Sequence, residues 1–301
     1  MYRGTMNGNV CRWLPVIAAA ICITISCSSD PAESYDIPER CPVVLKVENG
    51  SDVDVMDEGM TVGAFFVSKD NGSVLRRNEM MIVGEHGMLM QDRDTIVPLK
   101  LDSYDFIAYS PYDSSWDNLP ESMVEFDVEE DQSSDIAYIS SDLMISTSIS
   151  ISNGTAEAVF RHAMSRIMLH ITDKTGVFDM RFSSAVINDM KLRSYLYIYG
   201  ESSSTDDKMI GDIVCRRLDC KDRRASFTAV FPAQQPVDGK LTVEAEIAGI
   251  IYDFEITGVP AMESGNVLVC SMSMTERGLE LENTELTDWE DGGSGSIVVY
   301  E

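Results

Sequence analysis

A period of two in the apolar residues runs through most of the chain after residue 40 and limits what the chain can fold into. In KLTVEAEIAGIIYDFEIT, residues 240–257, apolar side chains recur at every second position on either side of Ala248-Gly249. Successive side chains of a strand point to opposite faces, so this pattern predicts two half-buried strands joined by a two-residue turn. Residues 41–48 and 266–274 repeat the period. Long helical stripes are absent, and we therefore expect an all-β fold.

Turn signals and a change of parity add detail to this prediction. Asn71-Gly72 stands between two strand-like runs in TVGAFFVSKDNGSVLRR, residues 61–77, and Asn-Gly is the strongest short hairpin signal. In VFRHAMSRIMLHI, residues 159–171, the apolar parity changes between Met164 and Ile167. A bulge near Ser165-Arg166 would keep both apolar sets inward. Short strands between closely spaced turns are typical of antiparallel sandwiches.

The first 26 residues have the pattern of a signal peptide. Arg3 and Arg12 precede an apolar run from Trp13 to Ile25, which is shorter than the roughly 20 residues that a membrane-spanning helix needs. The chain turns polar directly after Cys27. This resembles a bacterial lipoprotein signal, in which the Cys is acylated and becomes the first mature residue, although Thr24 stands where Leu is commonest. Ordinary signal cleavage nearby is the alternative.

Length and composition suggest two domains after the signal peptide. Removal of residues 1–26 leaves 275 of the 301 residues, more than one small core needs. We expect a linker over residues 27–40, an N-terminal β-sandwich over 41–155 and a C-terminal β-sandwich over 156–301. The Ser-rich run SISISNGTAE, residues 148–157, is the expected junction.

The charge balance argues against a nucleic-acid partner. The chain has 50 acidic and 23 basic residues, a net charge of −27, whereas phosphate binding needs a basic surface. Motifs of nucleotide, metal or nucleophile sites are absent, so we predict no enzyme activity, no cofactor and no metal site. We expect structural roles for the three histidines. Export permits disulfides, but the sequence favours no specific pair among four cysteines that lack metal-binding spacing, namely Cys41, Cys215, Cys220 and Cys270.

Several segments in a fixed order resemble the fimbrillin family of Bacteroidetes, the subunits of type V pili. They are the lipoprotein-like start at Cys27, then DFIAYSPY (105–112), SDLMIS (141–146), VFRHAMSRIMLHI (159–171), AVFPAQ (229–234), MESGNVLVCSMSM (262–274) and LELENTELTDWEDGGSG (279–295). The resemblance implies two antiparallel transthyretin-like β-sandwich domains in tandem. It also implies a structural or adhesive protein at the cell surface, lipid-anchored in the outer membrane, with other fimbrillin-like pilus subunits as partners. His162 would be a structural position of the family.

The resemblance further implies assembly by strand donation, in which an extended segment enters the open groove of a neighbouring subunit. The tail GGSGSIVVYE, residues 292–301, suits a donor. Its glycines give a flexible lead, and a short β-prone stretch follows, formed by Ile297, Val298, Val299 and Tyr300. An ordinary last strand that completes its own sheet is the alternative.

In the family, a trypsin-like protease removes the first strand of stalk subunits. If residues 41–48 are the first strand, no basic residue lies between Lys46 and Lys69, and the family's usual Arg is missing. Arg40 is a possible maturation site upstream, but cleavage there leaves this strand in place. We therefore expect an anchor or terminal subunit. The alternative is an earlier first strand near residues 35–37, with true maturation at Arg40.

A second function class is a surface lipoprotein that binds a glycan or another ligand on similar sandwiches. Its sequence signature would be exposed aromatic side chains clustered on loops. One such cluster is present in AYSPYDSSW, formed by Tyr109, Tyr112 and Trp116.

Overall fold

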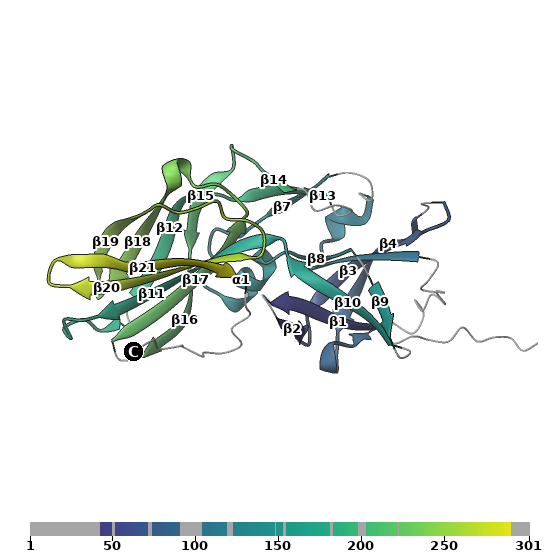
Figure 1. Cartoon of the computed structure of the whole chain (residues 1–301), viewed down its shortest axis with the longest axis horizontal. Coiled ribbons are helices and arrows are strands. Elements are labelled where there is room, and N and C mark those ends of the chain that lie inside the picture. Colours follow the sequence, from purple (N-terminus) through teal and green to yellow (C-terminus); the bar gives the residue numbers. More distant parts are fainter. Residues whose placement is uncertain are drawn as a thin grey trace, which may run out of the picture. The chain divides into compact units, whose positions relative to one another are not determined.

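Strands form almost all of the regular structure, as the alternation predicts (Figure 1). A computed structural model describes residues 43–49, 52–71, 74–90, 104–118, 123–147, 149–152, 155–180, 183–197, 203–221 and 223–289. Within this part of the chain the strands belong to four sheets, and α1 (Asp135–Ser141) is the one α-helix. The all-β prediction is confirmed.

The largest sheet has nine strands and contains the first strand of the described chain. Its order is β2-β1-β10-β8-β6-β3-β4-β5, with β9 paired to β10. All pairs in it are antiparallel except β1 with β10. The strands are β1 (Val43–Asn49), β2 (Asp52–Val55), β3 (Thr61–Ser68), β4 (Val74–Val83), β5 (Leu89–Met90), β6 (Tyr104–Ser110), β8 (Met144–Ser146), β9 (Ile149–Ser152) and β10 (Thr155–His162).

Three smaller sheets contain the remaining strands. The five-stranded sheet has the order β16-β17-β11-β20-β21, with β11 and β20 parallel. The other two have the orders β15-β12-β18-β19 and β14-β13-β7. Their strands are β7 (Met123–Asp127), β11 (Met164–Asp173), β12 (Ser183–Lys191), β13 (Arg193–Tyr197), β14 (Ser203–Thr205), β15 (Ile210–Val214), β16 (Arg216–Lys221), β17 (Arg224–Pro232), β18 (Lys240–Ile247), β19 (Ile250–Thr257), β20 (Asn266–Thr275) and β21 (Gly278–Asp288).

The hairpin predicted for residues 240–257 is confirmed. Strands β18 and β19 pair with Val243 opposite Phe254, and Ala248-Gly249 forms the turn with φ values of 53° and 80°. Positive φ at both central residues gives a turn whose twist matches that of the strands. The apolar side of β18 is buried, whereas Tyr252 and Phe254 are half-buried. The β19 side of the hairpin therefore contributes less to the core than its aromatic residues suggest.

The bulge predicted near Ser165-Arg166 is wrong, although the change of parity is real. Two strands replace the single bulged strand: β10 ends at His162, and β11 begins at Met164. They lie in different sheets, so Ala163 is the point where the chain passes from the nine-stranded to the five-stranded sheet. Met164 and the next residue, Ser165, are both buried. The side of the chain that faces the core therefore changes here, and no extra residue is inserted into the pairing of a strand.

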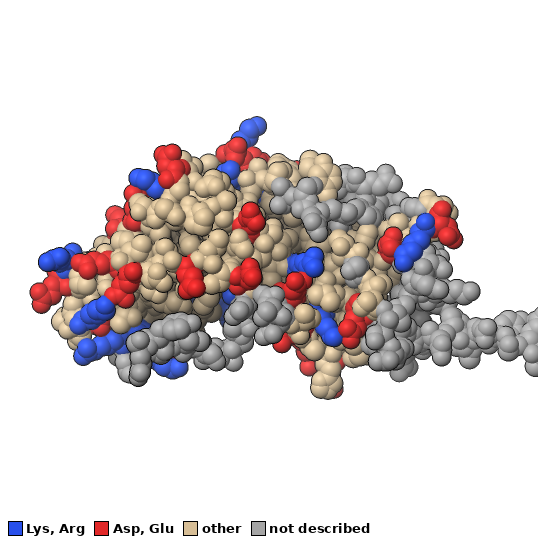
Figure 2. Space-filling model, viewed as in Figure 1, with Lys and Arg blue, Asp and Glu red and all other residues tan. Residues whose placement is uncertain are grey.

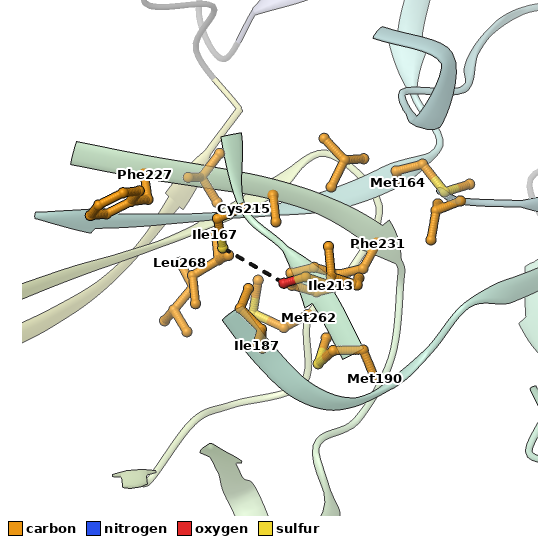
Figure 3. Packing of buried hydrophobic residues seen from close by; sticks show 14 of the residues in the cluster. Met164, Ile167, Ile187, Met190, Ile213, Cys215, Phe227, Phe231, Met262 and Leu268 are labelled. Atoms are coloured by element: carbon orange, nitrogen blue, oxygen red, sulfur yellow. Dashed lines mark hydrogen bonds between the residues drawn. The ribbon is translucent and has the colours of Figure 1, made fainter. Parts of the chain in front are cut away.

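The main core lies between the five-stranded and the four-stranded sheets. Figure 3 shows Ile167 and Leu268 from one sheet close to Ile187 and Ile213 from the other. Residues from earlier in the chain, including Phe65 and Trp116, belong to the same cluster. A second cluster covers the opposite face of the nine-stranded sheet. The domain boundary at residues 155 and 156 stays a prediction.

Candidate assembly site around the first strand

Strand β1 is inserted between two neighbours instead of lying at an edge. It pairs in parallel with β10 on one side and antiparallel with β2 on the other. The side chains of Val43, Leu45 and Val47 are 8%, 0% and 5% exposed and belong to the second core cluster. Burial of such a side chain contributes about 1.5–3 kcal/mol, so three of them give about 5–9 kcal/mol. The first strand is thus part of the core.

The other face of β1 is attached to β10 by charged side chains. Lys46 Nζ lies 2.9 Å from a carboxylate oxygen of Glu157, and Arg161 Nε donates to Glu48 over 2.5 Å. These side chains are between 28% and 70% exposed, and such exposed pairs contribute about 1 kcal/mol at most. The pairs favour the observed parallel register, while the apolar face supplies most of the stabilisation.

A tight loop closes against the middle of β1. Gly87 has a φ of +70°, and a Cβ atom built there would lie 2.6 Å from the carbonyl oxygen of Leu45 and 2.5 Å from Val55. A β-bridge between Val44 and Met88 continues this contact. The loop can approach β1 this closely only because residue 87 has no side chain.

We expect Gly87→Ala to destabilise the protein by about 2–4 kcal/mol, because it adds a backbone clash to the cost of a left-handed conformation. The matched control is Gly59→Ala. Gly59 also has a positive φ, +88°, but nothing lies within 4 Å of its added Cβ, so about 1 kcal/mol is expected. Urea unfolding measures both changes. Equal losses would show that the close approach to β1 costs nothing.

A stacked cluster joins the end of β10 to the last described residue. The His162 ring lies 4.0 Å from the Trp289 ring with an interplanar angle of 7°, and Arg166 lies over the same indole at 4.6 Å. His162 Nδ1 is 2.9 Å from an oxygen of Asp142. The Trp289 amide donates to the carbonyl of Gly265 over 2.7 Å. The segment after Trp289 therefore starts from a fixed point beside the strand that pairs with β1.

The prediction of an exposed aromatic cluster that could bind a ligand is wrong. Tyr109 is 0% and Trp116 is 1% exposed, and their ring centroids lie 4.3 Å apart at an interplanar angle of 35°. The Tyr109 hydroxyl donates to the carbonyl of Asp113 over 2.9 Å, and burial raises the pKa of Tyr109 well above its ordinary value. Tyr112 is half-buried. Tyr109 and Trp116 thus belong to the core, and Tyr112 alone does not form an exposed aromatic cluster, so the specific sequence support for a glycan-binding surface is lost.

The residues proposed for lipidation, cleavage and donation lie outside the described part of the chain. They are Cys27, Arg40, Ile297, Val298, Val299 and Tyr300. In the described ranges, no group of His, Cys, Asp and Glu is arranged to hold a metal ion. No helix there is both long and apolar enough to pass through a membrane. Cys215 and Cys270 are buried free thiols.

Comparison with solved structures defines the class of protein that shares this fold. A candidate cell adhesion protein from Bacteroides ovatus is 13% identical with a TM-score of 0.66, covering 82% of this chain and 97% of its own. One from Bacteroides uniformis is 16% identical with a TM-score of 0.61, covering 82% and 98%. At these identities the likeness shows the fold alone. No curated protein sequence matches the chain.

A family model gives a narrower assignment than the shared fold. A family model described as fimbrillin-like matches residues 52–289, which is most of the chain. The chain belongs to the fimbrillin-like family. The resemblance noted in the sequence is therefore confirmed, and a fimbrial or adhesive role at the cell surface follows from the family.

Proposed function

We propose that the chain is a lipid-anchored pilus subunit of the outer membrane that keeps its first strand and acts as an anchor or terminal subunit. Cys27 would carry the lipid, and other fimbrillin-like subunits would be its partners. Its role would be structural or adhesive, without catalysis. We further propose that it consists of two tandem transthyretin-like sandwiches and that residues 297–300 are the strand given to a neighbour.

The observation that carries the proposal is the position of β1 relative to the basic residues. Three apolar side chains of β1 lie in the core, and no Lys or Arg stands between Lys46, inside the strand, and Lys69. A trypsin-like protease therefore has no site in the connection that follows β1. Cleavage after Arg40 would remove the lipid but leave the strand, so no groove would open between β10 and β2.

Mass spectrometry of the mature N-terminus tests this proposal. In protein from the outer membrane, we expect residue 27 with attached lipid as the first residue. Fibres purified from the same cells should contain the chain in small amounts relative to the stalk subunit. Cys41 at the N-terminus of abundant fibre protein would overturn the proposal and would favour maturation at Arg40.

A further inference from the structure

Strand β19 is an outer strand of the four-stranded sheet and pairs over its whole length without interruption. Among the described strands it pairs with β18 alone, from Ile250 to Thr257, and its register does not shift. The outer strands β15, β16 and β21 each pair across a shift of register, a feature that protects an edge from further pairing. Strand β19 also contains no Lys and no Pro, the residues that most often block an edge. A further strand can therefore join this edge.

The turn of the hairpin fixes which backbone groups of β19 face outward. In a two-residue hairpin the residues that flank the turn, here Ile247 and Ile250, exchange hydrogen bonds. Bonded and non-bonded pairs alternate along an antiparallel ladder, so the residues of β19 that bond to β18 are Ile250, Tyr252, Phe254 and Ile256. The N–H and C=O groups of Ile251, Asp253 and Glu255 point away from β18. Within the described part of the chain, these groups have no hydrogen-bond partner.

The core-facing side of β19 is partly uncovered along this edge. Ile250 is 50% exposed, and Tyr252 and Phe254 are half-buried. The residues opposite them on β18 are fully buried, so the core extends under β19 without being closed there. A strand added beside β19 covers these three side chains if it carries an apolar residue at every second position.

The opposite side of the β18–β19 hairpin is acidic. Asp253 and Glu255 lie on it beside Glu244 and Glu246 of β18, and Lys240 pairs with Glu255 over 2.9 Å. The other three carboxylates form no ion pair with a described residue. In Figure 2, acidic side chains are spread over the surface where Figure 1 draws β18, β19 and β21. Exposed charges act over about 8 Å at physiological salt, so this side of the hairpin attracts a basic segment.

We propose that the edge of β19 binds an extended segment of another protein, in which apolar side chains alternate with Lys or Arg. The outward N–H and C=O groups of β19 supply the backbone hydrogen bonds. The apolar side chains of the segment cover Ile250, Tyr252 and Phe254, and its basic side chains lie on the acidic side of the hairpin. A second copy of this chain is disfavoured, because it would add its own acidic β19 to the same edge. The proposal depends neither on the lipid nor on strand donation by residues 297–300.

The experiment measures the binding of short capped peptides to the full chain by isothermal titration calorimetry. The probe has the sequence KVKVKVT. One control peptide, KKKVVVT, has the same composition without the period of two, and the other, EVEVEVT, has the opposite charge. We expect the probe to bind about tenfold more tightly than either control, because it alone places apolar side chains on one side and basic side chains on the other.

Two substitutions at one position separate the backbone contact from the charge. Asp253→Pro removes an outward N–H and obstructs a partner strand, but it leaves the hydrogen bonds to β18 in place, so binding of the probe should weaken about tenfold. Asp253→Asn keeps the N–H and should weaken binding about threefold. Glu58→Gln removes the same charge from an exposed position outside this sheet and should change nothing.

Three outcomes would overturn the proposal. Equal binding of KVKVKVT and KKKVVVT would mean that the peptide responds only to the net charge of −27. Equal binding by the wild-type and Asp253→Pro proteins would place the contact elsewhere on the chain. Dimers of the wild-type protein without peptide, absent from the Asp253→Pro protein in analytical ultracentrifugation, would assign the edge to a second copy. An unchanged circular dichroism spectrum of each variant excludes unfolding as the cause of weaker binding.

Discussion

Replacement of Cys27 by Ala is expected to abolish acylation and to remove the protein from the outer-membrane fraction. The reason is that the short apolar run before Cys27 cannot span a bilayer, so the lipid would be the attachment. Two or more acyl chains hold a protein stably on a membrane, whereas one chain is marginal. Growth with an alkyne fatty acid, followed by fractionation and detection of the label on this protein, measures both effects.

Cys41→Ala is the matched control for this prediction. It removes a thiol 14 positions further along and should leave both the label and the membrane attachment intact. Retention of the acyl label by the Cys27→Ala protein would show that another residue carries the lipid. An unlabelled wild-type protein in the medium would favour ordinary signal cleavage, the alternative for this N-terminus.

Local strand pairing was readable from the sequence because the partners are neighbours in the chain. The β18–β19 hairpin has its turn at Ala248-Gly249, and its apolar residues face one side on both strands. The β3–β4 hairpin around Asn71 is likewise confirmed. In the β18–β19 hairpin the period of two and the turn chemistry fix the same register, whereas the β3–β4 pairing contains register shifts on either side of Phe66.

Pairing between distant strands was not readable. Alternation shows which face of a strand is buried but not which strand lies beside it. The parallel pair of β1 with β10 joins residues more than 100 positions apart, with Val43 opposite Ala156. A propensity scale contains no such tertiary information.

The site was predictable only in part, for a related reason. Burial of Val43, Leu45 and Val47 followed from their alternation, so the prediction of a first strand over 41–48 agrees with β1. The role of Gly87 was missed because a close approach of two backbones leaves no local pattern. The loop-like sequence around Trp116 suggested exposure, yet its ring packs against Tyr109 and Phe126 in the core.

The largest loss of stability is expected from Phe231→Ala in strand β17. Phe231 is 0% exposed and belongs to the main core cluster, close to Met262 and Ile213 in Figure 3. Truncation of a buried Phe to Ala removes its transfer free energy and leaves a cavity, at a cost of about 3–5 kcal/mol. Urea unfolding should show this loss as a lower midpoint with an unchanged slope.

Two further variants on the β18–β19 hairpin separate burial from residue type. Phe254→Ala removes the same side chain from a half-buried position and should cost about half as much, because less apolar area leaves water there. Glu246→Ala, on the exposed side of β18, should change the free energy of unfolding by less than about 0.5 kcal/mol. Equal losses for Phe231 and Phe254 would contradict the core described here. They would mean that both side chains are buried to the same extent, whereas in the structure Phe231 is buried and Phe254 is half-buried. A large loss for Glu246 would contradict the period of two itself, from which the fold of this chain follows.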